Sequence, residues 1–192
     1  MVATVNVVEG NGSPVTWSVI TAGRYCTTDS YNPGDTYPCV VPSVGYNYSY
    51  WKSICLSLSG TYTSISNLRW FTSTNVATNW DLGTGGMLLV GVLDTGEGGI
   101  AAGSYQQAAG VQGTSGYYFM DGTNGHASFK TQTPGYANAD GKSSASPLVV
   151  DASTSYSGTT YTKHIVTQVK LDTDAVQGDK PNETFTWRYD ET

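Results

Sequence analysis

Charge is the scarcest property of this sequence. Lys, Arg, Asp and Glu make up 12% of its 192 residues, about half the average share of roughly 25%. The 9 Lys and Arg residues never stand side by side, so the sequence lacks the basic cluster that nucleic-acid binding requires. With 15 acidic residues the formal net charge is −6. We expect no nucleic-acid partner.

Long apolar runs are also missing. The longest one, Met87–Leu93, is far shorter than the ~20 residues of a membrane-spanning helix. The first residues, Met-Val-Ala-Thr-Val-Asn, have neither the basic nor the apolar region of a secretory leader. We therefore expect synthesis in the cytosol and no membrane partner.

Cysteine is scarce and odd in number, with only Cys26, Cys39 and Cys55. An odd count excludes a complete set of disulfides within one chain. The favoured interpretation is three reduced, partly buried thiols, and the alternative is a Cys26–Cys39 bridge that staples the loop between them. Zinc on these thiols would need a fourth ligand, and the nearest histidine is His126. We predict no zinc site.

Groups that carry catalysis are sparse. The sequence has two histidines, His126 and His164, and no Gly-x-Ser-x-Gly motif. Most of its acids stand in predicted turns, where a carboxylate caps backbone amides. The loop at residues 172–179 fails the EF-hand pattern because Val176 and Gln177 occupy its fifth and sixth positions, although a looser calcium site stays open there. We predict no enzyme activity, no catalytic residues, no cofactor and no metal site.

What the chain has in abundance is Gly, Ser and Thr, which together fill more than a third of it, and 14 Tyr with 5 Trp. This mixture disfavours long helices and suits strands. Residues 46–62 alternate between apolar even positions and Ser-rich odd positions, which predicts one long half-buried strand, or two with a bend, whose Ser-rich face meets water. Trp51 and Lys52 both break the alternation and predict a bulge or bend.

Other segments bounded by turn-forming residues are also predicted to be strands. The run Met87–Leu93 is apolar at both its odd and its even positions. It therefore predicts a central strand covered on both faces, or a strand at a subunit contact. Phe185, Trp187 and Tyr189 share one face of the last strand and should fill the core. A single helix is predicted at residues 104–109. The predicted strands cover residues 4–8, 15–20, 68–72, 87–93, 116–120, 127–131, 148–151, 161–171 and 184–189.

About ten short strands predict an all-β fold, a single-domain sandwich of jelly-roll type with long loops that spans residues 1–192. Two long, weakly charged loops stand out: residues 22–45 carry Tyr, Pro and Gly, and residues 94–116 carry seven Gly. Loops of this length are usually functional or covered by another molecule. The tyrosines fit core packing, a protein interface or a sugar-stacking platform. The candidate interface residues are Tyr31, Tyr37, Tyr46, Tyr48, Ile100 and Tyr105.

Segments near the end of the chain, together with one in its first half, resemble parts of known proteins. Gln-Val-Lys-Leu at 168–171 is followed by a turn and by Glu-Thr-Phe-Thr-Trp-Arg-Tyr-Asp-Glu-Thr at 183–192, and Leu-Arg-Trp-Phe-Thr stands at 68–72. These segments resemble the closing hairpin of β-sandwich virion proteins of tailed phages and related viruses. The resemblance covers well under a quarter of the chain. It implies a capsid decoration or tail-associated protein of jelly-roll type, often trimeric, and it brings no catalytic residues.

These observations lead to one functional expectation and one alternative. We expect a non-enzymatic virion structural protein, a capsid decoration (cement) protein that stabilises the shell through subunit contacts. Its partners would be further copies of itself, as a trimer, and the major capsid protein, and its location would be the virion. The alternative is a secreted carbohydrate-binding or adhesive module that uses exposed tyrosines.

Overall fold

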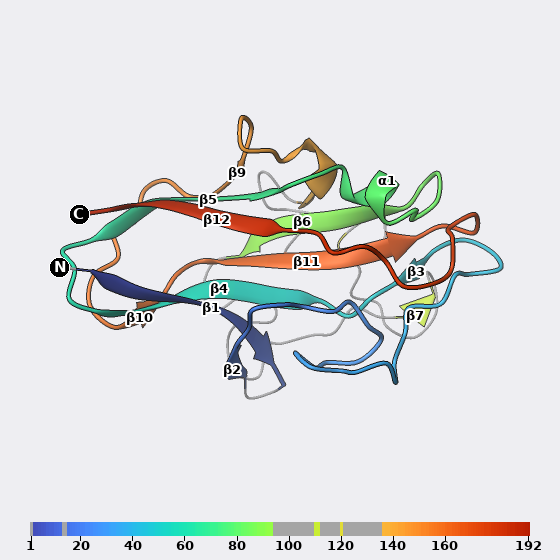
Figure 1. The fold of residues 1–192 in the computed structure, drawn as a ribbon, viewed down its shortest axis with the longest axis horizontal. Coiled ribbons are helices and arrows are strands. Elements are labelled where there is room, and N and C mark those ends of the chain that lie inside the picture. The colour runs from blue at the N-terminus through green and yellow to red at the C-terminus, as the bar shows by residue number, and fades with distance from the viewer. Residues whose placement is uncertain (1, 13–14, 94–109, 112–119, 121–135) are drawn as a thin grey trace.

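The secondary structure is dominated by antiparallel strands (Figure 1). The computed structural model describes residues 2–12, 15–93, 110–111, 120 and 136–192. Within these ranges the strands form two sheets, and the helical elements are two single turns, α1 (Val76–Asn79) and the 3-10 turn η1 (Ala139–Gly141). The all-β prediction is confirmed.

The larger sheet is built around β4 and β11. Its central order is β2, β1, β4, β11, β6 and β8, with β10 beside β4, and with β3 and β7 continuing along the end of β11. Every pairing is antiparallel. Its strands are β1 (Ala3–Asn11), β2 (Thr16–Val19), β3 (Asn47–Tyr48), β4 (Lys52–Gly60), β6 (Met87–Leu93), β7 (Gly110–Val111), β8 (Tyr136–Asn138), β10 (Thr160–Tyr161) and β11 (His164–Leu171).

The smaller sheet has three strands, β12 (Phe185–Glu191), β5 (Ile65–Thr72) and β9 (Leu148–Asp151), in that order. The chain begins and ends at the same end of the molecule (Figure 1). There the Ala3 amide donates to the Glu191 carboxylate at 2.7 Å, so the first strand of one sheet touches the last strand of the other.

One hydrophobic core joins the two sheets. The larger sheet supplies Ile54, Leu56 and Leu58 from alternate positions of β4, and the smaller sheet supplies Leu68 and Trp70 from β5. Alternation with period two places these side chains on one face of each strand. The two sheets therefore pack as a sandwich-like pair, with β-strand faces turned toward a common interior.

The predicted bend near Trp51 is confirmed, because β3 and β4 are separated by Ser49–Trp51. Ser49 forms two hydrogen bonds to β11 at this break. The Ser49 amide donates to the Val169 carbonyl, and the Val169 amide donates to the Ser49 hydroxyl, both at 3.0 Å. The expectation that the Ser-rich face meets water is wrong at Ser49 and Ser53, which are fully buried.

The reason for that burial is a second apolar cluster on the other face of the larger sheet. It contains Tyr48, Trp51, Leu89, Met120 and Val166. Ser53 pairs with Val166 across β4 and β11, so its side chain lies on the same face as this cluster. Small hydroxyl side chains are thus enclosed beside large apolar ones. The alternation of polar and apolar residues along the sequence could not indicate this burial.

Several strand predictions hold in detail. β6 has the predicted bounds. Leu88, Leu89 and Val90 are all fully buried, so side chains on both faces of this strand are covered. The predicted strand at 161–171 is divided into β10 and β11. Phe185, Trp187 and Tyr189 are only partly buried, but they pack against the core as expected. The predicted helix at 104–109 and strand at 127–131 lie outside the described residues, as does the predicted strand at 116–120 apart from Met120.

Candidate functional site

The connection from β2 to β3, residues 20–46, is a long loop without helix or strand. It exposes four large apolar side chains, Tyr31, Tyr37, Val40 and Val44, with between 46% and 74% of each residue accessible to solvent. We call these four residues the loop surface. They lie on the segment that carries Pro33, Pro38 and Pro42, whose fixed φ angles restrict the loop's conformations.

The underside of this loop is attached to the larger sheet by hydrogen bonds. The Tyr50 amide donates to the Cys26 carbonyl at 2.9 Å, and the Tyr25 hydroxyl donates to Thr167 Oγ1 at 2.7 Å. Farther along, Asn47 Nδ2 donates to the Val40 carbonyl at 2.6 Å. The loop surface is therefore displayed by a backbone with defined anchor points, which lowers the entropy cost of binding a partner.

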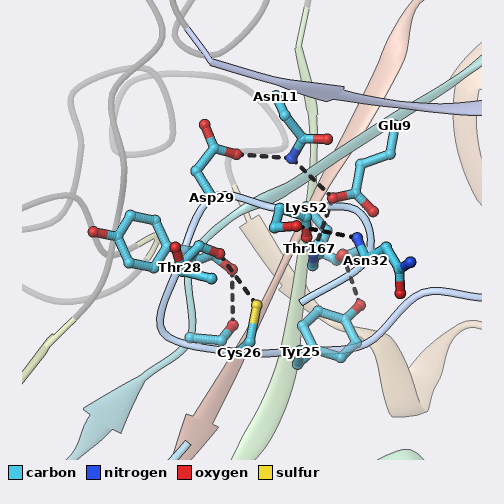
Figure 2. Close-up of polar contacts among 12 residues, drawn as sticks. Glu9, Asn11, Tyr25, Cys26, Thr28, Asp29, Asn32, Lys52 and Thr167 are labelled. Atoms are coloured by element: carbon cyan, nitrogen blue, oxygen red, sulfur yellow. Dashed lines mark hydrogen bonds and ion pairs between the residues drawn. The ribbon is translucent and has the colours of Figure 1, made fainter. Parts of the chain in front are cut away.

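Beneath the same loop lies a buried ion pair (Figure 2). Lys52 Nζ is 2.8 Å from Glu9 Oε1, and the two residues are 2% and 0% exposed. Lys52 Nζ also donates to the Ser30 carbonyl of the loop. A buried charge pair is costly to desolvate and needs good hydrogen bonding to persist. Ser30 thus ties the loop directly to charged groups on β1 and β4.

Two further polar residues complete what we call the Glu9–Lys52 cluster. Asn11 Nδ2 donates to Glu9 Oε1 at 3.0 Å and to Asp29 Oδ1 at 2.7 Å, and Asp29 Oδ2 accepts from the Gly12 amide at 2.6 Å. Burial raises the pKa of Glu9, and the neighbouring Lys52 only partly opposes this effect. Glu9 is consequently a carboxylate with an increased tendency to accept a proton.

The structure separates the predicted interface residues. Tyr31 and Tyr37 lie on the exposed loop surface. Tyr46 is half-buried, with Lys170 Nζ 3.9 Å from its ring centroid. Tyr48 is 1% exposed and belongs to the second apolar cluster, so it packs within this chain and offers no surface. Ile100 and Tyr105 lie outside the described residues.

The three cysteines are all free thiols, as favoured by the sequence. Cys26 and Cys55 are buried, and Cys26 Sγ donates to the Thr28 carbonyl at 3.1 Å. Burial raises the pKa of Cys39 to about 12 and also raises that of Cys55. A thiol with a raised pKa is a poor nucleophile because little of it is ionised at neutral pH.

Several carboxylates hold backbone amides, as predicted for turn acids. Asp172 and Asp174 accept from the amides of Gly85 and Thr84 at 2.8 and 2.9 Å, which fastens two loops together. Asp151 accepts from the amide of Ser153 at 2.9 Å. Although burial raises its pKa, this and its other hydrogen bonds outweigh burial and lower the pKa of Asp151 below the usual value. In the part of the chain that the structure describes, no three His, Cys, Asp or Glu residues gather to hold a metal ion.

His164 is an unusual polar residue of the interior. It is 1% exposed, its ring lies 5.3 Å from that of Trp17, and neither ring nitrogen has a hydrogen-bond partner among the described residues. Burial lowers its pKa to about 4. The imidazole is therefore neutral at physiological pH. His126, the other histidine, lies outside the described residues.

Sequence reasoning missed the Glu9–Lys52 cluster, although two signals for it were present. On β4, Lys52 lies on the same face as the apolar even-numbered residues. On β1, Glu9 lies on the same face as Val5 and Val7, whose side chains pack against the core. A positive residue on the buried face of one strand and a negative residue on the buried face of another indicate a buried ion pair, once the two strands are known to be neighbours.

Comparison of the chain with protein-family models, with curated proteins and with solved structures found no match in any of the three. Among the described residues, no helix has both the length and the apolar character needed to cross a membrane.

Proposed function

We propose that this chain is a non-enzymatic structural protein of a virion, a capsid decoration protein that stabilises the shell by binding neighbouring subunits. The observation that carries the proposal is the loop surface: four exposed apolar side chains on a loop held from below by hydrogen bonds. Exposed apolar groups that follow one another along an anchored segment are typical of sites that bind protein.

The composition supports the same proposal. With 12% charged residues, the chain has few groups that would oppose close contact between copies of itself or with a shell. In this proposal the sandwich is of jelly-roll type, the chain forms a trimer, and the loop surface contacts the major capsid protein. The resemblance of residues 168–171 and 183–192 to phage virion proteins points in the same direction. Synthesis would take place in the host cytoplasm before assembly.

A mass spectrum of purified virus particles tests the location, and a size measurement of the purified chain tests the assembly. The proposal expects the chain among the particle proteins and an oligomer in solution. A monodisperse monomer that binds a glycan array would overturn it in favour of the alternative, a secreted carbohydrate-binding or adhesive module in which Tyr31 and Tyr37 stack on sugar rings.

A further inference from the structure

The Glu9–Lys52 cluster brings an amine, a carboxamide and a carboxyl group together inside the protein. Glu9 and Asn11 lie two residues apart on β1, and both side chains project to the same face. Gly10 pairs with Ser53 in the antiparallel ladder, so the next position places Asn11 opposite Lys52. Lys52 Nζ and Asn11 Nδ2 contact the same oxygen atom, Glu9 Oε1, at 2.8 and 3.0 Å.

We propose that Lys52 and Asn11 form an intramolecular isopeptide bond, with Glu9 as the group that takes up the proton of the Lys52 ammonium. The modification would join β1 to β4 covalently through their side chains. It belongs to the fold and does not rest on the proposed function.

The reaction balances with the groups present. The Lys52 ammonium gives a proton to Glu9, and the neutral Nζ attacks Asn11 Cγ to form an Nζ–Cγ bond. The second Nζ proton passes to Nδ2, the Cγ–Nδ2 bond breaks, and Nδ2 leaves as ammonia. Glu9 remains as a neutral carboxylic acid. No oxidant or other reactant is needed, because the step exchanges one amide for another.

Burial favours this direction. The starting state holds an ammonium and a carboxylate that are 2% and 0% exposed, whereas the linked state holds a neutral amide and a neutral acid. Removing both charges relieves the desolvation cost of a buried ion pair. The raised pKa of Glu9 agrees with a carboxyl group that keeps the proton it receives.

The surroundings also orient the carboxamide. Glu9 Oε1 and Asp29 Oδ1 accept hydrogen bonds from Asn11 Nδ2, while Asn11 Oδ1 is buried without a partner among the described residues. Negative charge develops on Oδ1 during the attack, and the Glu9 hydroxyl, once it carries the proton from Lys52, is a donor that can stabilise this charge. Asp29 holds the leaving nitrogen on the other side.

A competing reaction has to be distinguished, because Asn11 precedes Gly12. Attack of the Gly12 nitrogen on Asn11 Cγ would form a succinimide and release ammonia as well. In this structure the Gly12 amide donates to Asp29 Oδ2 at 2.6 Å, which holds that nitrogen in another interaction. A test must therefore show which nitrogen is bonded to Asn11 Cγ, and not only that ammonia is lost.

Intact-mass measurement of the purified chain, followed by trypsin digestion, makes this distinction. The proposal expects a mass about 17 Da below that of the sequence, the loss of one ammonia. Arg24, Lys52 and Arg69 are the first three basic residues. A linked Lys52 resists trypsin, so peptide 1–24 should stay attached to peptide 25–69.

Variants assign the bond to its residues. Lys52→Arg and Asn11→Ala should each have the full mass of their sequences, and Glu9→Gln should remain unlinked because the amide cannot accept the proton. Asn11→Asp should still link, with a loss of about 18 Da as water. Asn6→Ala, a control on the same strand, should keep the loss of ammonia. Far-ultraviolet circular dichroism checks that each variant folds.

Two results would overturn the proposal, and one of them needs no variant. The first is an unmodified wild-type chain of full sequence mass that releases peptide 1–24 after digestion. The second is a loss of ammonia that persists in Lys52→Arg, which would assign the loss to the succinimide at Asn11 and Gly12.

Discussion

Buried ionisable side chains take two different forms in this molecule. Lys52 and Glu9 keep hydrogen-bonding partners of opposite charge, whereas His164 is enclosed beside Trp17 as a neutral ring. The difference follows from the cost of desolvation, since an isolated buried charge is far less stable than a neutral group. His164 should therefore make stability depend on pH.

The His164 contribution has a definite sign. Its pKa falls from 6.5 in the unfolded chain to about 4 in the folded one, so between these values the unfolded chain binds more protons. Stability is then fully present above pH 6.5 and is lost as the pH falls toward 4. Through this residue the free energy of unfolding should be about 2 kcal/mol lower at pH 5 than at pH 7.

Urea unfolding of the wild type and of His164→Phe at both pH values measures this effect. Phe retains a ring against Trp17 but cannot take up a proton, so the variant should lose about 2 kcal/mol less than the wild type on acidification. The other titrating groups, His126 included, are common to both proteins and cancel in the comparison. Equal pH dependence in the two proteins would contradict the assignment.

At the scale of the strands, hydroxyl side chains supply hydrogen bonds at two breaks between strands of the larger sheet. Ser49 Oγ accepts from the Val169 amide at 3.0 Å, where β3 passes into β4. Thr162 Oγ1 accepts from the Leu56 amide at 3.1 Å, where β10 passes into β11. At both places the hydroxyl pairs an amide that the broken ladder would otherwise leave without an acceptor.

Removing the Ser49 hydroxyl should therefore be costly. Ser49→Ala leaves the Val169 amide buried and unpaired, and we expect the free energy of unfolding to fall by about 1–3 kcal/mol. Ser59→Ala, on the half-exposed end of β4, is the matched control and should change stability by less than about 0.5 kcal/mol. Denaturant unfolding gives both values, and similar values for the two variants would show that the hydroxyl has no such role.

The strands themselves could be predicted from local pattern. β6 and β9 have the predicted bounds, because a run of apolar residues between turn formers is a local signal. The order of strands in the sheets is not local, and neither is the second apolar cluster. Ser49 and Ser53 were therefore expected at the surface, since their polarity alone does not reveal what packs against them.

The candidate site could be predicted only in part, for the same reason. The loop and its tyrosines stand out in the sequence, and Tyr31 and Tyr37 are exposed on it. Tyr48 has the same residue type but lies inside, because its strand pairs with β11 and faces Trp51. The Glu9–Lys52 pair joins residues 43 positions apart, and it could be recognised only after β1 and β4 were known to pair.

At the scale of the whole molecule, the long loop links the interior to the surface. Its inner side contacts the Glu9–Lys52 cluster through Ser30, and its outer side carries the loop surface. If the loop surface binds another subunit, its side chains should matter for assembly and not for folding. These two effects can be separated because Tyr31 and Tyr37 are about half exposed on a loop whose backbone is anchored by hydrogen bonds.

The double variant Tyr31→Ser with Tyr37→Ser tests this separation. We expect its free energy of unfolding to change by less than about 0.5 kcal/mol, because exposed side chains contribute little to folding. Its affinity for a further copy or for capsid shells should fall by about tenfold or more, since exposed tyrosines at an interface often carry much of the binding energy. Val149→Ser, an exposed apolar residue on β9, is the control and should retain assembly. Sedimentation velocity and shell co-sedimentation measure the binding, and undiminished assembly of the double variant would exclude the loop surface as the contact.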